Sequence, residues 1–276
     1  MNATIIVLYK PGLEVVCTIK EIASQKNTVI AVVNEASDEI KGYIRGLQNI
    51  VMLENETNIG LASALNQGMQ IAFEIDADTI LFLDQDSKPY HGMDVDLKKE
   101  LDANPNAMIC PTLVDIKQKK ISRPIRYCDP EVVVGMATSG TFLKSKTAKK
   151  IGLVKDELFI DGIDHEWCFR AKHFGIKLLR SRRVVMRHNM GDRGICYMGK
   201  HKPIHDNPIR HYYIIRNFFY LARLNYVPFK WKAVEFFKTL RRVPIYVLTS
   251  REKTKTSKLI ARGVIDGVLK RWGKLV

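Results

Sequence analysis

The sequence contains no apolar run that approaches the roughly 20 residues needed to cross a lipid bilayer. Its N-terminus starts directly on a strand-like run, without the charged and apolar regions of a signal peptide. It also has no internal repeat and no low-complexity tract. These absences argue against an integral membrane protein, a secreted protein and a repeat array, and they predict a cytoplasmic protein.

The sequence also contains no Cys-x-x-Cys pair among its five cysteines, which argues against a disulfide framework. Its histidines do not show the spacing of a zinc site. The cysteines are Cys17, Cys110, Cys128, Cys168 and Cys196. Their scatter predicts reduced thiols in a core. With 276 residues, 46% of them hydrophobic, the chain can bury a full core, as one domain or as a domain with an appendage.

Acidic residues are scarce in the last quarter of the chain. Residues 200–276 contain 18 Lys and Arg against 4 Asp and Glu, which supplies +14 of the total net charge of +15. Large apolar and aromatic side chains alternate with these bases. Three interpretations are open: docking on an anionic membrane surface, a solvated helical tail that packs its aromatic side chains, and binding to nucleic acid.

Strand-like and helix-like segments alternate before this region. β-branched apolar runs predict strands at 4–9, 28–33, 50–53 and 78–84, and helical periodicity predicts helices at 13–24, 38–47 and 61–75. This alternation predicts an α/β fold with right-handed crossovers and a mainly parallel sheet. Ligands of such sheets bind beyond the carboxyl ends of the strands, where Tyr9, Asn34 and Asp84 lie.

The fourth strand ends at two carboxylates, in the sequence Leu-Phe-Leu-Asp-Gln-Asp. Residues i and i+2 of a strand point the same way, so Asp84 and Asp86 can converge on a divalent cation such as Mg²⁺ or Mn²⁺. Such an ion can bridge the phosphates of a nucleotide. Acids at a strand end also serve as turn formers or helix caps, so the pair alone is a weak signal.

Several ordered motifs carry a resemblance to a known family. The segment 58–68 (NIGLASALNQG) followed by LFLDQD resembles inverting glycosyltransferases of family two with the A-type fold, most closely the bacterial rhamnosyltransferases. The resemblance continues through 138–141, 159–171, 187–188 and 210–217, and so covers essentially the whole chain. It implies a Rossmann-like, mainly parallel sheet with flanking helices, followed here by a basic helical C-terminal region.

The resemblance also implies the residues of a nucleotide-sugar site. They are Tyr9, Pro11, Asn34, Asn58 and Gly60, together with Asp84 at the diphosphate. One departure is visible, because the family usually reads Val-Asp-Asn-x-Ser where this chain has Val-Asn-Glu-Ala-Ser at 33–37. Asn34 can still form hydrogen bonds with a base or ribose but carries no charge.

The acids in the segment 159–171 (FIDGIDHEWCFRA) resemble the part of this fold that holds the general base and the acceptor sugar. Asp164 matches the family position of the base, which takes a proton from the acceptor hydroxyl. Glu166 is expected to orient the acceptor or a cation, and Asp161 and Trp167 to contact the acceptor. The alternative is a helix N-terminus whose acids complement the helix dipole.

Two further segments complete the implied site. His188 resembles the histidine that joins the metal site in some family members, and an imidazole beside two carboxylates suits Mn²⁺ somewhat better than Mg²⁺. The alternative is a partly buried histidine at a strand end. Ser139 and Gly140 are small residues that allow close approach of an acceptor sugar, although Gly140 could also simply form a turn.

The resemblance implies single-displacement transfer of a sugar, with L-rhamnose from dTDP-rhamnose as the expected donor, to a cell-surface polysaccharide or an oligosaccharide on polyprenyl diphosphate. Residues 1–200 would form the catalytic domain and residues 201–276 a region that docks on the anionic inner face of the cell membrane, with no nucleic acid expected. A UDP-sugar donor and a non-catalytic carbohydrate- or nucleic-acid-binding protein are the alternatives. The acceptor, its linkage and the oligomeric state are not indicated.

Overall fold

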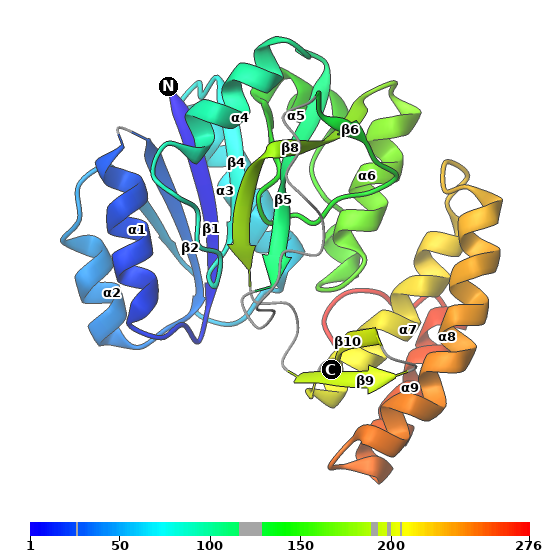
Figure 1. Ribbon diagram of the computed structural model, residues 1–276. Coiled ribbons are helices and arrows are strands. Elements are labelled where there is room, and N and C mark those ends of the chain that lie inside the picture. Colours follow the sequence, from blue (N-terminus) through cyan, green and yellow to red (C-terminus); the bar gives the residue numbers. More distant parts are fainter. Residues whose placement is uncertain (26, 116–128, 189–192, 198–199, 205) are drawn as a thin grey trace.

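Figure 1 shows the computed structural model, which describes residues 1–25, 27–115, 129–188, 193–197, 200–204 and 206–276. The first third of the chain alternates strand and helix as predicted. Its elements are β1 Asn2–Tyr9, α1 Glu14–Ser24, β2 Thr28–Glu35, α2 Asp38–Arg45, β3 Ile50–Glu54, α3 Leu61–Glu74 and β4 Thr79–Asp84. The predicted boundaries agree with these to within a few residues.

The middle of the chain completes the sheet with shorter and more irregular elements. They are α4 Met93–Asp102, β5 Ala107–Asp115, β6 Glu131–Val132, β7 Phe142–Lys144, α5 Ser145–Ile151, the 3-10 helix η1 Asp156–Leu158, α6 Ile163–His173 and β8 Lys177–His188. A separate antiparallel pair follows, formed by β9 Arg193–Tyr197 and β10 Lys200–Ile204.

The eight strands β1 to β8 form one sheet in the order β3-β2-β1-β4-β7-β5-β8-β6. Strands β1 to β4 pair in parallel, and so do β5 and β8. The short β7 pairs antiparallel with β4 and β5, and β6 pairs antiparallel with β8. The parallel half therefore brings the carboxyl ends of β1, β2 and β4 to one edge, where a ligand site is expected.

Helices cover both faces of the sheet, which explains why its strands read as continuous apolar runs. One face packs against α1, α2 and α4 through side chains such as Ile19, Ile44 and Leu97. The other packs against α3, α5 and α6, with Met69 and Trp167 in its core. The result is a three-layer α/β/α arrangement (Figure 1).

Three helices form the C-terminal region, α7 Pro208–Arg223, α8 Phe229–Thr249 and α9 Lys253–Val268. They lie together beside the α/β layers (Figure 1). Helix α7 is largely buried, and Tyr212 on it donates a hydrogen bond to the buried Asp266 of α9, at 2.9 Å. Helix α8, by contrast, has no buried residue. Across the described ranges, no helix is both long enough and apolar enough for a bilayer crossing.

The expectation of free thiols in a core is confirmed for two of the three cysteines whose side chains the structure describes, and is wrong for the position of Cys17. Cys110 and Cys168 are buried free thiols, and Cys17 is an exposed one. Burial raises the pKa of the two buried thiols to about 12, which keeps them protonated and unreactive near neutral pH. Cys128 and the side chain of Cys196 lie outside the described residues.

Candidate active site

A cavity of about 820 Å³ opens at the carboxyl ends of β1, β2 and β4. Tyr9, Asn34 and Asp84 line it, as the parallel-sheet topology predicted. The opposite wall comes from the loop before α6, from the start of α7 and from the C-terminal tail at Lys274 and Leu275. Segments from the whole length of the chain therefore meet around one cavity.

Asp84, Asp86 and His188 form a cluster that could hold a metal ion, because one ligand atom from each lies within 4.8 Å of the others. His188 Nε2 lies 3.9 Å from Asp84 Oδ2, and His188 Nδ1 lies 3.6 Å from Asp86 Oδ1. Two carboxylates and one imidazole suit Mn²⁺ or Mg²⁺. The donor set thus fits a divalent ion at the position predicted from the Asp-x-Asp spacing.

Two buried serines hold this cluster in place. Ser139 Oγ accepts a hydrogen bond from the backbone N–H of Asp84 at 3.1 Å and lies 2.5 Å from Ser87 Oγ. Ser87 Oγ in turn lies 3.3 Å from His188 Nδ1. Ser139 is buried, so the structure gives it a supporting role under the strand end rather than the predicted contact with an acceptor sugar.

The electrostatics of Asp84 favour a bound cation. Its side chain is 42% exposed, but the surface faces the cavity, which Asp86 and Asp164 also line. Desolvation, together with the charges of Asp86 and Asp164, raises the pKa of Asp84 to about 6, although His188 opposes the shift. A positive ion would relieve this repulsion between carboxylates.

The residue between the two aspartates fixes the first strand. Gln85 Oε1 accepts a hydrogen bond from the backbone N–H of Tyr9 at 2.8 Å, and Gln85 Nε2 donates to the Tyr9 carbonyl at 3.1 Å. Both hydrogen-bonding groups of the Tyr9 backbone are thereby satisfied across the cavity edge. Pro11, which was predicted to contact the nucleotide, is buried and does not line the cavity.

Asparagines organise the far end of the cavity. Asn34 Nδ2 donates to the Gly60 carbonyl at 3.1 Å, and Asn34 Oδ1 accepts from Asn55 at 3.0 Å. Asn58 Oδ1 accepts from the backbone N–H of Gly60 at 2.9 Å, which closes an Asx turn. The Asn34 amide is therefore engaged with the protein, so its role here is to shape the cavity wall.

Gly60 is required by both its backbone and its surroundings. Its φ of +90° is unfavourable for residues with a side chain, and a Cβ atom there would lie 2.5 Å from the ring of Phe159. The Phe159 ring stacks in turn on Tyr213 of α7, with ring centroids 5.0 Å apart. The glycine therefore allows the loop before α3 to meet the loop before α6.

The loop before α6 is held in an unusual backbone conformation. Phe159 and Asp161 have positive φ values of 61° and 64°. Asn217 on α7 donates from Nδ2 to the carbonyls of Leu158, Ile160 and Asp161 at 3.0, 2.8 and 2.6 Å. Strained residues at a site persist when surrounding contacts fix them, and Asn217 supplies those contacts.

Asp164 lies in the first turn of α6 and faces the cavity. The backbone N–H of His165 donates to Asp164 Oδ1 at 2.8 Å, and His165 Nδ1 lies 3.0 Å from the same oxygen. Burial would raise the pKa of Asp164, but these contacts outweigh it and hold the pKa below its usual value. Burial lowers the pKa of His165, and the contact with Asp164 outweighs that effect and raises it.

The other two acids of the segment have different surroundings. Asp161 lines the cavity but forms a two-point ion pair with Arg210, with Arg210 Nε 3.1 Å from Asp161 Oδ2 and Nη2 2.5 Å from Oδ1. Glu166 is fully buried, bound by Arg170 at 2.9 and 2.8 Å and by the Tyr226 hydroxyl. Glu166 is thus part of the core and cannot contact an acceptor or a cation, contrary to the prediction.

Trp167 and Gly140 are likewise structural. Trp167 is only 3% exposed, packs edge-on against Phe82 and donates from Nε1 to the Gly152 carbonyl at 2.9 Å. Gly140 is buried with φ of +84°, and a Cβ there would lie 2.7 Å from the Pro111 ring. Neither residue can meet a saccharide, and Gly140 forms the turn that was its alternative interpretation.

A second, smaller cavity of about 370 Å³ lies on the other side of Asp164. Asp164 and Ala137 line both cavities. His165, Phe169 and Trp231 also line the smaller one, and the Trp231 ring lies 5.6 Å from the His165 ring. Asp164 therefore stands at the junction of two cavities.

Several residues of the site were missed by reasoning from the sequence. They are Phe159, Asn207, Arg210, Tyr213, Trp231 and Lys274, most of which come from the C-terminal region. The segment 210–217 does carry a signal, because Arg216 and Asn217 lie within an apolar helical stretch. Polar side chains in such a stretch indicate buried hydrogen bonds.

The chain is similar to known glycosyltransferases in sequence. A family model described as glycosyl transferase family 2 matches residues 4–174. The dTDP-rhamnosyl transferase RfbF of Shigella flexneri is 29% identical over 287 residues, with 97% of this chain and 96% of that protein covered.

Two solved structures are similar in fold. The crystal structure of GalNAc-T7 with UDP, GalNAc and Mn²⁺ superposes with a TM-score of 0.59 at 17% identity, over 84% of this chain and 54% of that one. Residues 1–349 of S. aureus TarS in complex with UDP-GlcNAc give 0.56 at 12% identity, over 98% and 73%. The chain thus spans about half the length of the GalNAc-T7 chain.

Proposed function

Because the chain belongs to glycosyl transferase family 2 and is therefore a glycosyltransferase, we propose that it transfers L-rhamnose from dTDP-rhamnose, with inversion, to a hydroxyl of a cell-surface polysaccharide or lipid-linked oligosaccharide. The choice of rhamnose as the transferred sugar is supported by the similarity, over nearly the whole chain, to a protein named as a dTDP-rhamnosyl transferase. The observation that carries the mechanism is that Asp84, Asp86 and Asp164 line one cavity.

In this proposal Asp84, Asp86 and His188 hold Mg²⁺ or Mn²⁺, with the imidazole favouring Mn²⁺. The bound ion would neutralise charge on the departing nucleoside diphosphate. The nucleoside then lies along Tyr9, Asn58 and other lining residues of the larger cavity. Asn34 is kept as a wall residue of this pocket, because its amide is bound to Gly60 and Asn55.

Asp164 is the proposed general base. In a single displacement, the acceptor hydroxyl must lie between the base and the anomeric carbon of the donor. A carboxylate that lines both cavities meets that condition. Asp161 is assigned a positioning role instead, because the two-point ion pair with Arg210 engages both of its carboxylate oxygens.

The smaller cavity is the proposed acceptor pocket. Sugars stack their apolar C–H faces on aromatic rings, and Trp231 together with Phe169 supplies such rings next to Asp164. Trp231 therefore takes the place that the sequence had suggested for Trp167. An acceptor held there would present a hydroxyl to Asp164 and, beyond it, to the donor.

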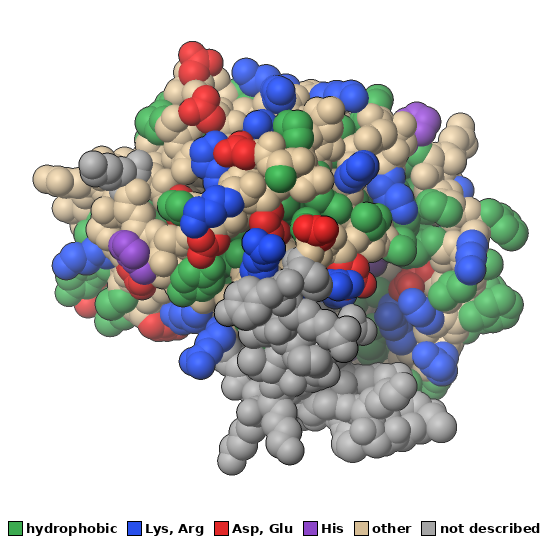
Figure 2. Space-filling model, turned by 45° about the horizontal axis from the view of Figure 1, so that its top comes forward, with side chains coloured by type: hydrophobic (Ala, Val, Ile, Leu, Met, Phe, Trp, Pro, Cys, Tyr) green, Lys and Arg blue, Asp and Glu red, His purple; other side chains and the backbone are tan. Residues whose placement is uncertain are grey.

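We further propose that the protein works at the cytoplasmic face of the cell membrane, with residues 1–200 as catalytic domain and residues 201–276 as docking region. Support comes from α8, whose apolar side chains are exposed at Phe229, Phe237 and Leu248 (84%, 68% and 70%). Figure 2 shows hydrophobic and basic side chains side by side along the right edge of the molecule. That combination fits an anionic lipid surface better than nucleic acid.

The experiment is a panel of nucleotide sugars incubated with the enzyme, Mn²⁺ and a saccharide acceptor. We expect transfer and slow hydrolysis with dTDP-rhamnose, and loss of both with chelator. A UDP-sugar is the alternative donor, since TarS was crystallised with UDP-GlcNAc. A preference for UDP-GlcNAc over dTDP-rhamnose would overturn the rhamnose assignment while leaving the glycosyltransferase itself intact.

The base assignment has its own test in the same assay. Asp164→Asn is isosteric, and we expect it to lower turnover roughly 10²-fold or more while donor binding persists. Asp161→Asn is the matched comparison, since it changes a neighbouring carboxylate that also lines the cavity. If Asp161→Asn loses turnover and Asp164→Asn keeps it, the base is Asp161.

A further inference from the structure

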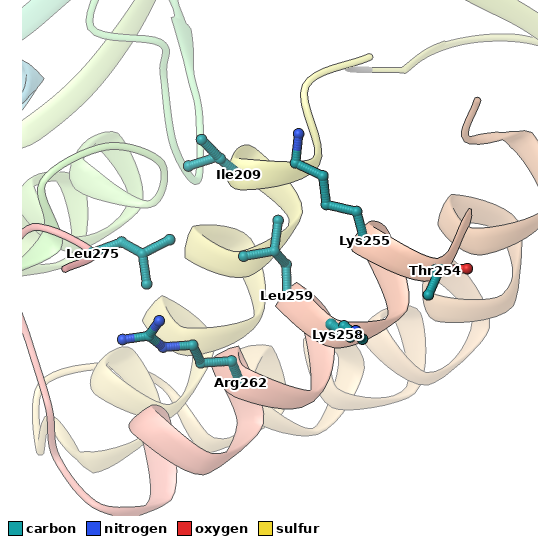
Figure 3. Close-up of a pocket in the computed structure, with 7 residues that line it drawn as sticks. All are labelled: Ile209, Thr254, Lys255, Lys258, Leu259, Arg262 and Leu275. Atoms are coloured by element: carbon teal, nitrogen blue, oxygen red, sulfur yellow. The ribbon is translucent and has the colours of Figure 1, made fainter. Parts of the chain in front are cut away.

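A third cavity, of about 600 Å³, lies in the C-terminal region between the start of α7, the first half of α9 and the C-terminal tail. Figure 3 shows Leu259 and Arg262 projecting from α9 into the space bordered by Ile209 and Leu275. The floor of this groove is thus apolar. It belongs to none of the motifs by which the active site was predicted.

The rim of the groove is basic. Lys255, Lys258 and Arg262 line it, and they lie three and four residues apart on α9, so one face of the helix carries all three. Lys255 forms an exposed ion pair with Glu252 at 2.9 Å. Arg262 lies 3.4 Å from Asp266. In the part of the chain that the structure describes, Lys258 has no carboxylate within ion-pair distance.

The groove adjoins the catalytic cavity. Ile209 and Leu275 line both, so the two spaces share a wall at the start of α7 and at the tail. Arg210 and Lys274, the chain neighbours of those two residues, face the catalytic cavity. A molecule extending from the catalytic cavity over this wall would meet apolar side chains and three cations together.

We propose that this groove binds a phosphate or diphosphate group carried on an apolar chain, as the lipid-linked end of the acceptor. The inference rests on the proposed function, because it assumes that the acceptor occupies the neighbouring active site. Cations at the rim recognise the phosphate oxygens, and the floor at Leu259 and Leu275 receives the first carbons of the chain. A free saccharide offers neither group to this surface.

Binding can be measured with three probes by calorimetry in EDTA, which removes divalent ions from the Asp84 and Asp86 site. Farnesyl diphosphate carries both the anion and the apolar chain, inorganic diphosphate only the anion, and farnesol only the chain. We expect farnesyl diphosphate to bind at least roughly 10-fold more tightly than either, because the groove contacts both parts. Equal binding of inorganic diphosphate and farnesyl diphosphate would overturn the proposal.

Variants locate the site. Lys255→Gln combined with Lys258→Gln is expected to weaken farnesyl diphosphate binding roughly 10-fold, since each cation near an anion contributes to affinity. Lys253→Gln is the matched control, because Lys253 is an exposed base on α9 that does not line the groove. Asp86→Ala should bind the probe as the parent does. If the double variant binds farnesyl diphosphate as tightly as the parent does, the probe binds elsewhere and the inference is wrong.

A kinetic measurement separates this inference from the proposed function. In transfer assays, the double variant should raise KM for an acceptor on a lipid diphosphate relative to KM for the same saccharide without lipid. A parallel rise for both acceptors contradicts the groove assignment. If the parent enzyme binds farnesyl diphosphate in the groove but transfers no sugar from any donor, the proposed function fails and the anion site stands.

Discussion

The three acids of the segment before and within α6 differ in their partners, and the partner decides what each can do. Arg210 neutralises Asp161, and Arg170 holds Glu166 inside the core. Asp164 alone combines access to both cavities with a titratable partner, His165. A carboxylate that must take a proton benefits from a contact that keeps it ionised.

The first prediction concerns the pH dependence of turnover. His165 keeps the pKa of Asp164 below its usual value, and burial opposes it. His165→Ala removes the imidazole contact but keeps the backbone N–H of residue 165, so the pKa of Asp164 rises and the base is protonated at a higher pH. The acid limb of kcat, measured at saturating donor and Mn²⁺, is expected to move toward higher pH.

The control for this shift is His173→Ala, which removes an exposed histidine at the end of α6 that lines neither cavity. Its acid limb should coincide with that of the parent. An acid limb unmoved in His165→Ala would mean that Asp164 does not titrate in the step that limits turnover.

The second prediction concerns the metal cluster. Asp86→Ala removes one of the three candidate ligands and should abolish Mn²⁺-dependent binding of dTDP, measured by calorimetry. The thermal unfolding midpoint should change little, because the Asp86 side chain is substantially exposed and contributes little to packing. Asp38→Ala is the control, since it removes a fully exposed carboxylate on α2. If the parent protein binds dTDP with the same affinity with and without Mn²⁺, the assignment of a metal site is wrong.

Residue roles could be predicted where strand geometry decides them, and not where helix geometry does. The i, i+2 spacing was enough to place Asp84 and Asp86 together. In α6, however, the buried face contains Ile163, Glu166 and Trp167, whereas Asp164 and His165 face outward. The charge of Glu166 favours a site residue, but Arg170 lies four residues later on the same helix face and pairs with it in the core.

At the level of elements, the predicted α/β fold of the A-type glycosyltransferases is confirmed, since the parallel strands β1 to β4 and their helices lie where the periodicity indicated. The antiparallel β7 was not predicted, because its three residues are too few to show a period. Nor could the sequence reveal that α7 holds the loop before α6, since contacts between residues 56 to 59 positions apart depend on the tertiary fold.

The third prediction concerns that contact. Asn217→Ala leaves the carbonyls of Ile160 and Asp161 without their side-chain donor, whereas the Leu158 carbonyl still accepts from Arg216, so the free energy of unfolding should fall by about 2–4 kcal/mol. Turnover should also fall, because the loop leads directly into Asp164. Urea denaturation and kcat measure the two effects. Asn225→Ala, in the exposed connection between α7 and α8, should change neither, and an Asn217→Ala protein as stable as the parent would contradict the role of the contact.

At the scale of the whole molecule, the uneven charge combines with an uneven apolar surface. Helix α7 buries apolar side chains such as Tyr213, Ile215 and Leu221, but α8 has none that is buried. Phe236, Phe237, Leu240 and others are exposed at helical spacing along one side of α8. Lys238 and Arg242 on the same helix pair with Glu235. Cations that are already paired contribute less to lipid binding, so on α8 the exposed bases Lys230 and Arg241 are expected to contribute most.

The last prediction tests this surface with vesicles. The protein should float with vesicles that contain anionic lipid, and added salt should release part of it, because each exposed base contributes about 1 kcal/mol that salt screens. Apolar side chains inserted below the headgroups should leave a salt-resistant remainder. Phe237→Ser with Leu240→Ser should reduce that remainder, whereas Lys230→Gln with Arg241→Gln should reduce the salt-sensitive part. Equal flotation with neutral and anionic vesicles, or a dimer in solution that both Ser substitutions dissociate, would instead assign the α8 surface to another partner.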